Sequence, residues 1–369
     1  MAMTGQSHNG VYAARMIEGL MESGAIKGAS VDRLQPASLD LTFGARAWRV
    51  RASFLPSRTR TVTARLTDGL AMQEINLNDG AVFERGCVYL VELNEHLKLS
   101  AGLIGAANPK SSTGRIDVFV RLVTDFGVAF DEIPTGYDGP LYAEVSPRTF
   151  SILARRGSSL NQLRLKAGDY RLDDQELQRL NSLAPLAGDG ANIDKGLGLC
   201  VALSAVDASN ADEVIGWRAR RHSGLIDVDK IGALDPHDYF EPIGPQKSGF
   251  IILDPDEFYI LASKEALVIP PDYAAEMTPI SPGLGEFRVH YAGFFDPGFG
   301  WSEEAGDASN GSRAVLEVRS HDAPFVLEDG QLVARLVYER MATRPDTLYG
   351  AGLKSNYQGQ GLKLSKHFA

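Results

Sequence analysis

Cysteine and histidine are scarce in this sequence. Of its 369 residues only Cys87 and Cys200 are cysteines, and the seven histidines are dispersed. Without a C-x-x-C pair or a paired framework of cysteines, a disulfide scaffold is not expected, and the thiols fit a reducing compartment. No histidine stands at ligand spacing from a cysteine or a carboxylate, so the sequence predicts no protein-bound zinc.

Long apolar runs and a positive net charge are also missing. No apolar stretch approaches the length needed to span a bilayer, and the N-terminus lacks a basic region followed by an apolar core. Lysine and arginine number 37 against 47 acidic residues, which gives a net charge of −10. This balance disfavours non-specific binding to nucleic acid or to an anionic membrane. We expect a cytoplasmic protein whose partners are neither nucleic acid nor membrane.

Most apolar stretches in the sequence are short and alternate with polar residues. They are separated by turns rich in the 38 glycines and 18 prolines, a texture typical of many short strands. Helical spacing is restricted to three stretches, 13–22, 173–183 and 271–277. The sequence therefore predicts a mainly β fold with a few short helices.

The chain contains two similar halves. "VYLVELNEHLKL" (88–99) aligns with "FYILASKEALVI" (258–269) at a shift of about 170 positions, and Glu144 aligns with Glu317 at about 173. A constant order of matches predicts tandem homologous β domains. We place the first at 24–190 and the second at 191–369. The alternative is that any two β-rich stretches resemble each other when aligned.

The segment "NPKSSTGRID" (108–117) gathers four donor-rich side chains, which are Lys110, Ser111, Ser112 and Arg115. It is either a polar surface turn or a cradle for an anion. It is not a P-loop, because a proline replaces the glycine before the lysine. In the second half, Ile280 stands opposite Lys110 and Gly285 opposite Arg115. Only the first half therefore keeps the cationic part of the segment.

The second half carries a compact hairpin signal, "AGFFDPGFG" (292–300), with Asp-Pro-Gly at the turn. Its counterpart in the first half, 127–139, is longer and irregular. Glu144 and Glu317 both follow these hairpins among alternating apolar residues. An inward-facing carboxylate there needs a partner, whereas an outward-facing one would be solvated.

The C-terminal stretch 348–368 is rich in glycine and polar residues and has no periodicity, which favours a mobile tail. It is either a disordered end or a segment that closes over a ligand. In the second case its candidate ligand-binding residues are Tyr349, Lys354, Tyr357, Gln358 and Gln360.

Four stretches in family order resemble the dCTP deaminase branch of the dCTP deaminase/dUTPase superfamily. They are "PASLDLTFG" (36–44), "KSSTGR" (110–115), the hairpin with the strand that follows it, and "YQGQG" (357–361). The resemblance implies two tandem copies of a dUTPase-like distorted β-barrel, which is β-clip- or jelly-roll-like. Family members of ordinary length are trimers with active sites between subunits. This chain therefore looks like a fused pair of subunits that assembles into a homo-oligomer.

The resemblance also implies a chemistry, namely hydrolysis of dCTP to dUTP and ammonia without a protein-bound zinc. Ser111 would hold the water and Arg115 would stabilise the developing charge. Glu317 or Glu144 would accept the proton, and Glu317 is favoured because it follows the better hairpin. The zinc-deaminase signature H-x-E…P-C-x-x-C is absent.

The remaining substrate contacts also follow from the resemblance. Lys110 and Ser112 would contact phosphate, with Mg²⁺ carried by the triphosphate. The hairpin residues Phe295, Asp296 and Gly298 would present the base and deoxyribose. Asn356 replaces the usual lysine before Tyr357, which puts the phosphate affinity of the tail in question.

Two alternatives stay open from the sequence. One is dUTP cleavage to dUMP and pyrophosphate, alone or combined with deamination. The other is a non-catalytic β scaffold that binds nucleotides. The Ser-Ser-x-x-Arg pattern favours deamination, because a dUTPase is expected to carry a different, Ser-Gly-type phosphate motif at that place.

Overall fold

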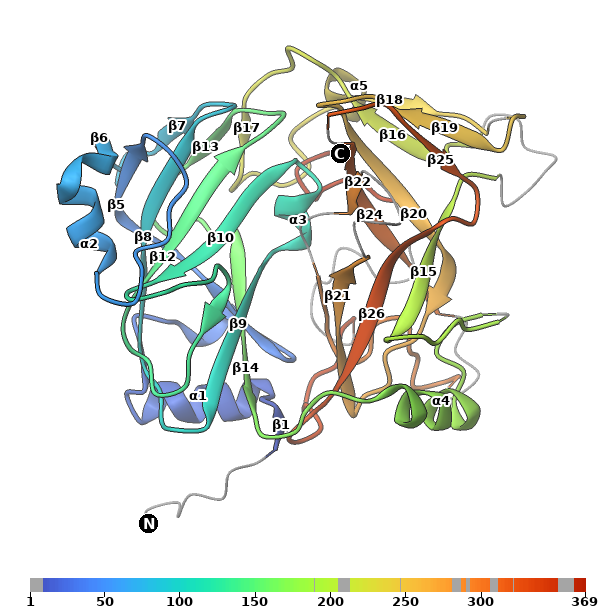
Figure 1. Ribbon diagram of the computed structural model, residues 1–369, viewed down its shortest axis with the longest axis horizontal. Coiled ribbons are helices and arrows are strands. Elements are labelled where there is room, and N and C mark those ends of the chain that lie inside the picture. The colour runs from blue at the N-terminus through green and yellow to red at the C-terminus, as the bar shows by residue number, and fades with distance from the viewer. Residues whose placement is uncertain are drawn as a thin grey trace.

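The structure is a computed structural model that describes residues 9–188, 190–204, 213–245, 247–280, 287–289, 293–305, 311–320, 322–350 and 362–369. Figure 1 shows two β-rich halves side by side, the first half of the chain in blue and green and the second in yellow to red. The predicted mainly β fold of two tandem domains is confirmed. The predicted boundary between residues 190 and 191 stays a prediction.

The first domain is built mainly from two antiparallel sheets. One sheet has the order β11-β9-β14-β4-β3, with β1 added on β14. Its strands are β1 (Gly10–Val11), β3 (Leu34–Gln35), β4 (Ser38–Leu41), β9 (Leu103–Pro109), β11 (Glu132–Ile133) and β14 (Asn161–Ala167). The other sheet has the order β10-β12-β8-β5-β6, with β2 on β8. Its strands are β2 (Ile26–Lys27), β5 (Phe43–Val50), β6 (Ala71–Asn76), β8 (Val88–Lys98), β10 (Val118–Thr124) and β12 (Asp138–Pro147).

The second domain has one large sheet and one ribbon. The large sheet has the order β18-β16-β20-β15-β26-β21-β23, with β24 on β20 and β22 on β24. Its strands are β15 (Leu197–Ala202), β16 (Gly216–Ala219), β18 (Phe240–Ile243), β20 (Phe258–Leu267), β21 (Tyr273–Pro279), β22 (Phe287–Val289), β23 (Phe294–Phe295), β24 (Ser312–Ser320) and β26 (Leu332–Arg340). The ribbon pairs β19 (Phe250–Leu253) with β25 (Phe325–Glu328).

The two domains repeat the same strand pairings. The pairs β8–β12, β9–β14 and β10–β12 in the first domain correspond to β20–β24, β21–β26 and β22–β24 in the second. The aligned tyrosines also make the same contact, because Tyr89 accepts a hydrogen bond from the Glu84 amide and Tyr259 accepts one from the Asp254 amide, each at 3.0 Å. The duplication read from the sequence is therefore present in the structure.

Two of the three predicted helices are present. Helix α1 spans Ala14–Glu22, and α4 spans Asp174–Leu183 behind a capping box formed by Asp173 and Glu176. The helix predicted at 271–277 is wrong. That stretch forms strand β21, which pairs with β26 on one edge and β23 on the other. Two rows of inter-strand hydrogen bonds outweigh the high intrinsic helix propensity of its Ala-Ala-Glu-Met run. The remaining helical turns are short: 31–33, α2 (Val62–Arg65), 66–70, α3 (Ser111–Gly114) and α5 (Pro236–Tyr239).

The domains share an apolar interface. Strand β13 (Ile152–Ala154), which pairs with β7 (Ala81–Phe83) in the first domain, also pairs in parallel with β17 (Ile226–Asp227) from the second half. Beside it, Phe150 packs edge-on against Tyr239 and Phe240, and Phe368 covers the same two rings. The core of the first domain therefore continues into the second half of the chain. Among the described residues, no helix is both long and apolar enough to cross a membrane.

Candidate active site

The Ser-Ser-x-x-Arg segment forms a single helical turn between β9 and β10. Helix α3 begins at Ser111, and the segment is held on the first domain by two hydrogen bonds to the Leu160 carbonyl. The Lys110 amide donates one at 2.9 Å and the Thr113 hydroxyl the other at 2.8 Å. Ser112 and Arg115 are buried and Ser111 is half-buried. The segment is therefore a fixed, sheltered element and not a loose surface turn.

The C-terminal end of the chain packs on this segment. Arg115 Nη1 donates to the Lys363 carbonyl at 2.7 Å, and the Ser365 hydroxyl donates to the Ser112 carbonyl at 2.8 Å. His367 contacts Ser365 through Nδ1 and the Val228 carbonyl through Nε2. Burial lowers the pKa of His367 to about 4, so its ring is neutral near pH 7. We call residues 362–369 the C-terminal anchor.

The predicted mobile tail is wrong for its last residues, which are fixed in the C-terminal anchor. Leu364, Ser365, His367 and Phe368 are all buried, because the apolar residues of this stretch complete the interface between the domains. Four of the predicted tail contacts, Lys354, Tyr357, Gln358 and Gln360, lie outside the described residues. The fifth, Tyr349, packs against Phe299 with ring centres 5.6 Å apart.

Cations gather around Lys110. Its Nζ pairs with a carboxylate oxygen of Asp40, a buried residue of β4 in the "PASLDLTFG" stretch. Lys366 of the C-terminal anchor lies close enough that, after burial, Lys110 is the next cause that lowers its pKa. Sequence analysis missed both Asp40 and Lys366. Asp40 stood in a quoted motif as an acid on an apolar strand, which was a usable signal.

Glu317 lies on β24 of the second domain and is buried. Side chains two residues apart on a strand share a face, so Glu317 and Arg319 point to the same side. Arg319 forms an ion pair with Asp117, which lies two residues after Arg115 of the Ser-Ser-x-x-Arg segment. The structure therefore brings the strand of Glu317 to the same place as Ser111, Ser112 and Arg115, although the two are about 200 positions apart in sequence.

Glu144, the counterpart of Glu317, has a different environment. Its carboxylate forms an ion pair with Arg121 on the neighbouring strand β10. The Arg121 guanidinium also stacks 3.7 Å over the ring of Phe130. Val118, next to Asp117, pairs with Pro147, so Glu144 lies three residues farther along β12, a distance of about 10 Å. The carboxylate of Glu144 is thus paired with an arginine, and the residue lies away from the Ser-Ser-x-x-Arg segment.

The predicted hairpin of the second domain packs on the first domain. Phe295 ends β23, and its carbonyl accepts a hydrogen bond from Arg164 Nη2 at 3.2 Å. The same nitrogen pairs with Asp296 at 3.1 Å. Burial raises the pKa of the Asp296 carboxyl, and the guanidinium of Arg164 opposes that shift. Gly298 has φ +95°, and a Cβ there would lie 2.8 Å from Leu348, so the turn requires glycine.

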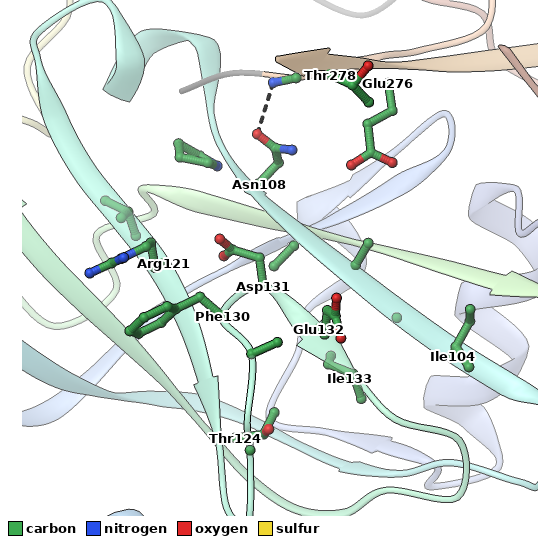
Figure 2. A pocket seen from close by; sticks show the side chains of 18 of the residues that line it. Ile104, Asn108, Arg121, Thr124, Phe130, Asp131, Glu132, Ile133, Glu276 and Thr278 are labelled. Carbon is green, nitrogen blue, oxygen red and sulfur yellow. Dashed lines mark hydrogen bonds between the residues drawn. The ribbon is translucent and has the colours of Figure 1, made fainter. Parts of the chain in front are cut away.

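A cavity of about 1270 Å³ opens between the domains, lined by β9, β10 and the 124–134 loop on one side and by β21 on the other (Figure 2). Asn108 stands at its edge, where its side-chain oxygen accepts a hydrogen bond from the Gly293 amide at 2.9 Å. Burial raises the pKa of Asp131 in its wall to about 7. Arg121 lines this cavity, whereas Ser111, Arg115 and Glu317 do not. In the part of the chain that the structure describes, no group of three or more His, Cys, Asp or Glu side chains could hold a metal ion.

Comparison with known proteins identifies both halves. The C-terminal domain of 2′-deoxycytidine 5′-triphosphate deaminase matches residues 173–368, and the N-terminal domain of the same family matches residues 8–169. The chain is also similar to a crystal structure of 2′-deoxycytidine 5′-triphosphate deaminase from Agrobacterium tumefaciens, with 48% identity and a TM-score of 0.85. The match covers 92% of this chain and 100% of that one.

Shorter relatives match only part of the chain. A dCTP deaminase from Haloarcula marismortui is 32% identical over 134 residues, which is 35% of this chain and 63% of that protein. A dUMP-forming dCTP deaminase from Beutenbergia cavernae is 27% identical over 166 residues, which is 42% of this chain and 79% of that protein. The chain belongs to the dCTP deaminase family, hydrolases that act on a carbon–nitrogen bond, and it carries an N-terminal and a C-terminal domain of that family in tandem.

Proposed function

We propose that the chain deaminates dCTP to dUTP and ammonia at one composite site, which takes Ser111 and Arg115 from the first domain and Glu317 from the second. The observation that carries this proposal is the ion pair between Asp117 and Arg319. It joins the end of the Ser-Ser-x-x-Arg segment to the strand of Glu317. The C-terminal anchor supports the proposal, because it holds the same segment from the opposite end of the sequence.

The proposed residues divide the chemistry between them. The Ser111 hydroxyl holds the water, and Glu317 accepts a proton from it as the water oxygen bonds to C4 of the cytosine ring. The bond between C4 and the amino nitrogen then breaks as the double bond between C4 and oxygen forms, and Glu317 returns its proton to the departing ammonia. The remaining water proton leaves the C4 oxygen and ends on N3 of the uracil ring. Arg115 stabilises the negative charge that develops during attack, which is worth most in a buried site.

Glu317 is preferred over Glu144 as the base for two physical reasons. Glu144 is held in an ion pair by Arg121, and this pair would have to break before its carboxylate could contact a water molecule. It also lies about 10 Å along β12 from the residue that pairs with Val118. Glu144 is therefore proposed as a structural counterpart of the catalytic glutamate.

The remaining contacts are proposed from chemistry and position. Lys110 and Ser112 bind phosphate oxygens, and Lys366 adds a cation beside Lys110. Mg²⁺ accompanies the triphosphate, whose negative charge it offsets. The hairpin residues Phe295, Asp296 and Gly298 present the base and sugar from the second domain. Tyr349, Lys354, Tyr357, Gln358 and Gln360 complete the substrate contacts.

A product assay tests this function. Purified protein is incubated with dCTP and Mg²⁺, and the products are separated by chromatography. We expect dUTP and ammonia, and we expect Arg115→Ala to lose turnover while keeping the wild-type circular dichroism spectrum. Unchanged dCTP would mean that the chain binds nucleotide without converting it. Normal turnover by Arg115→Ala would remove Arg115 from the mechanism.

Formation of dUMP is the second candidate, because the relative from Beutenbergia cavernae is named a dUMP-forming dCTP deaminase. The same chromatogram separates the two outcomes, since dUMP appears together with pyrophosphate. The Ser-Ser-x-x-Arg segment favours deamination over cleavage of dUTP alone. We further propose that the chain forms a homo-oligomer, which light scattering of the purified protein would test.

A further inference from the structure

A buried ion pair crosses the domain interface beside the proposed active site. Arg319 Nη1 contacts Asp117 Oδ2, and the side chains are 9% and 0% exposed. Thr149 donates its hydroxyl to the same carboxylate oxygen, and Arg319 Nη2 donates to the Asp256 carbonyl at 2.8 Å. Both charged groups are therefore fixed by contacts within their own domains. A pair of this kind tolerates little movement of one domain against the other.

Each member of the pair lies two residues from a proposed catalytic group. Asp117 follows Arg115, and its amide bonds to the Gly114 carbonyl, so it moves with helix α3. Arg319 follows Glu317 on β24, on the same face of the strand and about 7 Å away. The ion pair thus joins the two halves of the composite site two residues from Arg115 on one side and two residues from Glu317 on the other.

A composite site could take its Ser-Ser-x-x-Arg segment from the first domain and its glutamate strand from the second, or the reverse. The Asp117–Arg319 pair exists only in the first of these arrangements. Val118 pairs with Pro147 in the first domain and Phe287 pairs with Ser320 in the second, so the counterpart of Asp117 is Glu286, and the counterpart of Arg319 is Ser146. A contact between the second-domain counterpart of the Ser-Ser-x-x-Arg segment and the first-domain glutamate strand would therefore lack the arginine. The pair selects the arrangement in which the first domain supplies Arg115 and the second supplies Glu317.

We infer that Asp117 and Arg319 are positioning residues of the deaminase, which set the Ser111–Arg115 segment against Glu317 across the domain interface. This inference rests on the proposed roles of Arg115 and Glu317. The pair makes no contact with substrate in this account. Its effect is on the distance and orientation between groups that two different domains contribute, to which turnover is far more sensitive than binding.

The test uses variants chosen to keep the backbone intact. Asp117 has φ +55°, in the left-handed region that asparagine also tolerates, so Asp117→Asn removes the charge without added strain. Arg319→Gln removes the other charge, Arg319→Lys keeps it, and Asp117→Asn/Arg319→Gln removes both. Glu276→Gln is the matched control, because Glu276 pairs with Lys166 across the same interface at 2.9 Å. Kcat and KM for dCTP are measured for the full chain, and folding is followed by thermal melting.

We expect kcat to fall about 100-fold in Asp117→Asn and in Arg319→Gln, with KM changed less than about threefold. Arg319→Lys should retain more turnover than Arg319→Gln, because the charge still reaches Asp117. The kcat of the double variant should be no lower than that of the less active single variant, because the effects of coupled partners are not additive. Glu276→Gln should stay within about twofold of the wild type, although its interface contact is lost.

Two outcomes would overturn the inference. One is wild-type kcat in Asp117→Asn and Arg319→Gln while Arg115→Ala and Glu317→Gln are inactive. The other is an effect on KM alone, which would make the pair part of substrate binding. Failure of the proposed function looks different, since Arg115→Ala and Glu317→Gln would then turn over normally. If Arg319→Gln does not fold, Arg319→Lys and Asp117→Asn still decide, because each leaves one partner in place.

Discussion

The two domains share one scaffold and differ at the positions that bear charge. Strand pairings and the tyrosine contact of β8 and β20 are the same in both. By contrast, Lys110 and Arg115 of the first domain align with Ile280 and Gly285 of the second. The scaffold therefore tolerates loss of these cationic side chains in the second copy.

At the interface between the domains, aligned positions carry opposite charges. Lys166 of β14 and Glu339 of β26 are aligned positions, and they contact each other at 2.5 Å. Arg164 adds a contact to Glu339 at 3.1 Å, and both of these side chains are fully buried. Buried ion pairs add little net stability because of their desolvation cost, but they penalise wrong partners strongly. Opposite charges at equivalent positions therefore favour contact between unlike domains over contact between like ones.

The largest expected difference between the domains concerns their glutamates. Glu317→Gln should lower kcat by about 1,000-fold or more, because the proton acceptor is lost. Glu144→Gln should keep kcat within about threefold and lower the melting temperature, because Arg121 loses its buried partner. Steady-state kinetics and thermal melting of the two variants test this. Equal losses of kcat would mean that the two copies have not separated their roles.

The second contrast concerns the C-terminal anchor, through which the second domain contacts the Ser-Ser-x-x-Arg segment of the first. Removal of residues 362–369 takes away the carbonyl that accepts from Arg115 and the hydroxyl that holds Ser112. We expect kcat/KM to fall about 100-fold, while Ser365→Ala, which removes one contact, should lose less than about tenfold. Wild-type kcat/KM in the shortened chain would show that the C-terminal anchor has no part in the site.

The C-terminal anchor should also make the stability of the protein depend on pH. His367 has its pKa lowered by burial from 6.5 to about 4, so folding favours the neutral ring. Its contribution is present in full above pH 6.5 and is lost as the pH falls toward 4, by about 3 kcal/mol in total. Urea unfolding at pH 7.5, 6, 5 and 4 should therefore show a smaller loss of stability in His367→Gln than in the wild type. Parallel curves for the two proteins would contradict this assignment.

The general fold was predictable because it depends on local patterns. Alternating short apolar stretches predict strands, and helical spacing predicts α1 and α4. The stretch 271–277 was misread because β21 owes its conformation to partners on both edges, which a local pattern does not contain. The duplicated order of motifs likewise carried the correct domain count.

The site was predictable only in part. Lys110, Ser111, Ser112 and Arg115 stand together in sequence, so their cluster was visible. The ion pair of Asp117 with Arg319 joins residues 202 positions apart, and only the fold brings them together. The C-terminal anchor was hidden by the glycine-rich stretch before it, although the apolar spacing of Leu364 and Phe368 was a signal of burial.

The most direct test of the central claim mixes two inactive chains. Arg115→Ala and Glu317→Gln are purified, mixed in equal amounts, and allowed to exchange subunits, with exchange verified by mass spectrometry. If both halves of the site come from the same chain, every site in the mixture carries one defect, and turnover stays at the level of the separate variants. If the halves come from different chains, some sites are intact, and recovery of about a quarter of wild-type turnover would contradict the account.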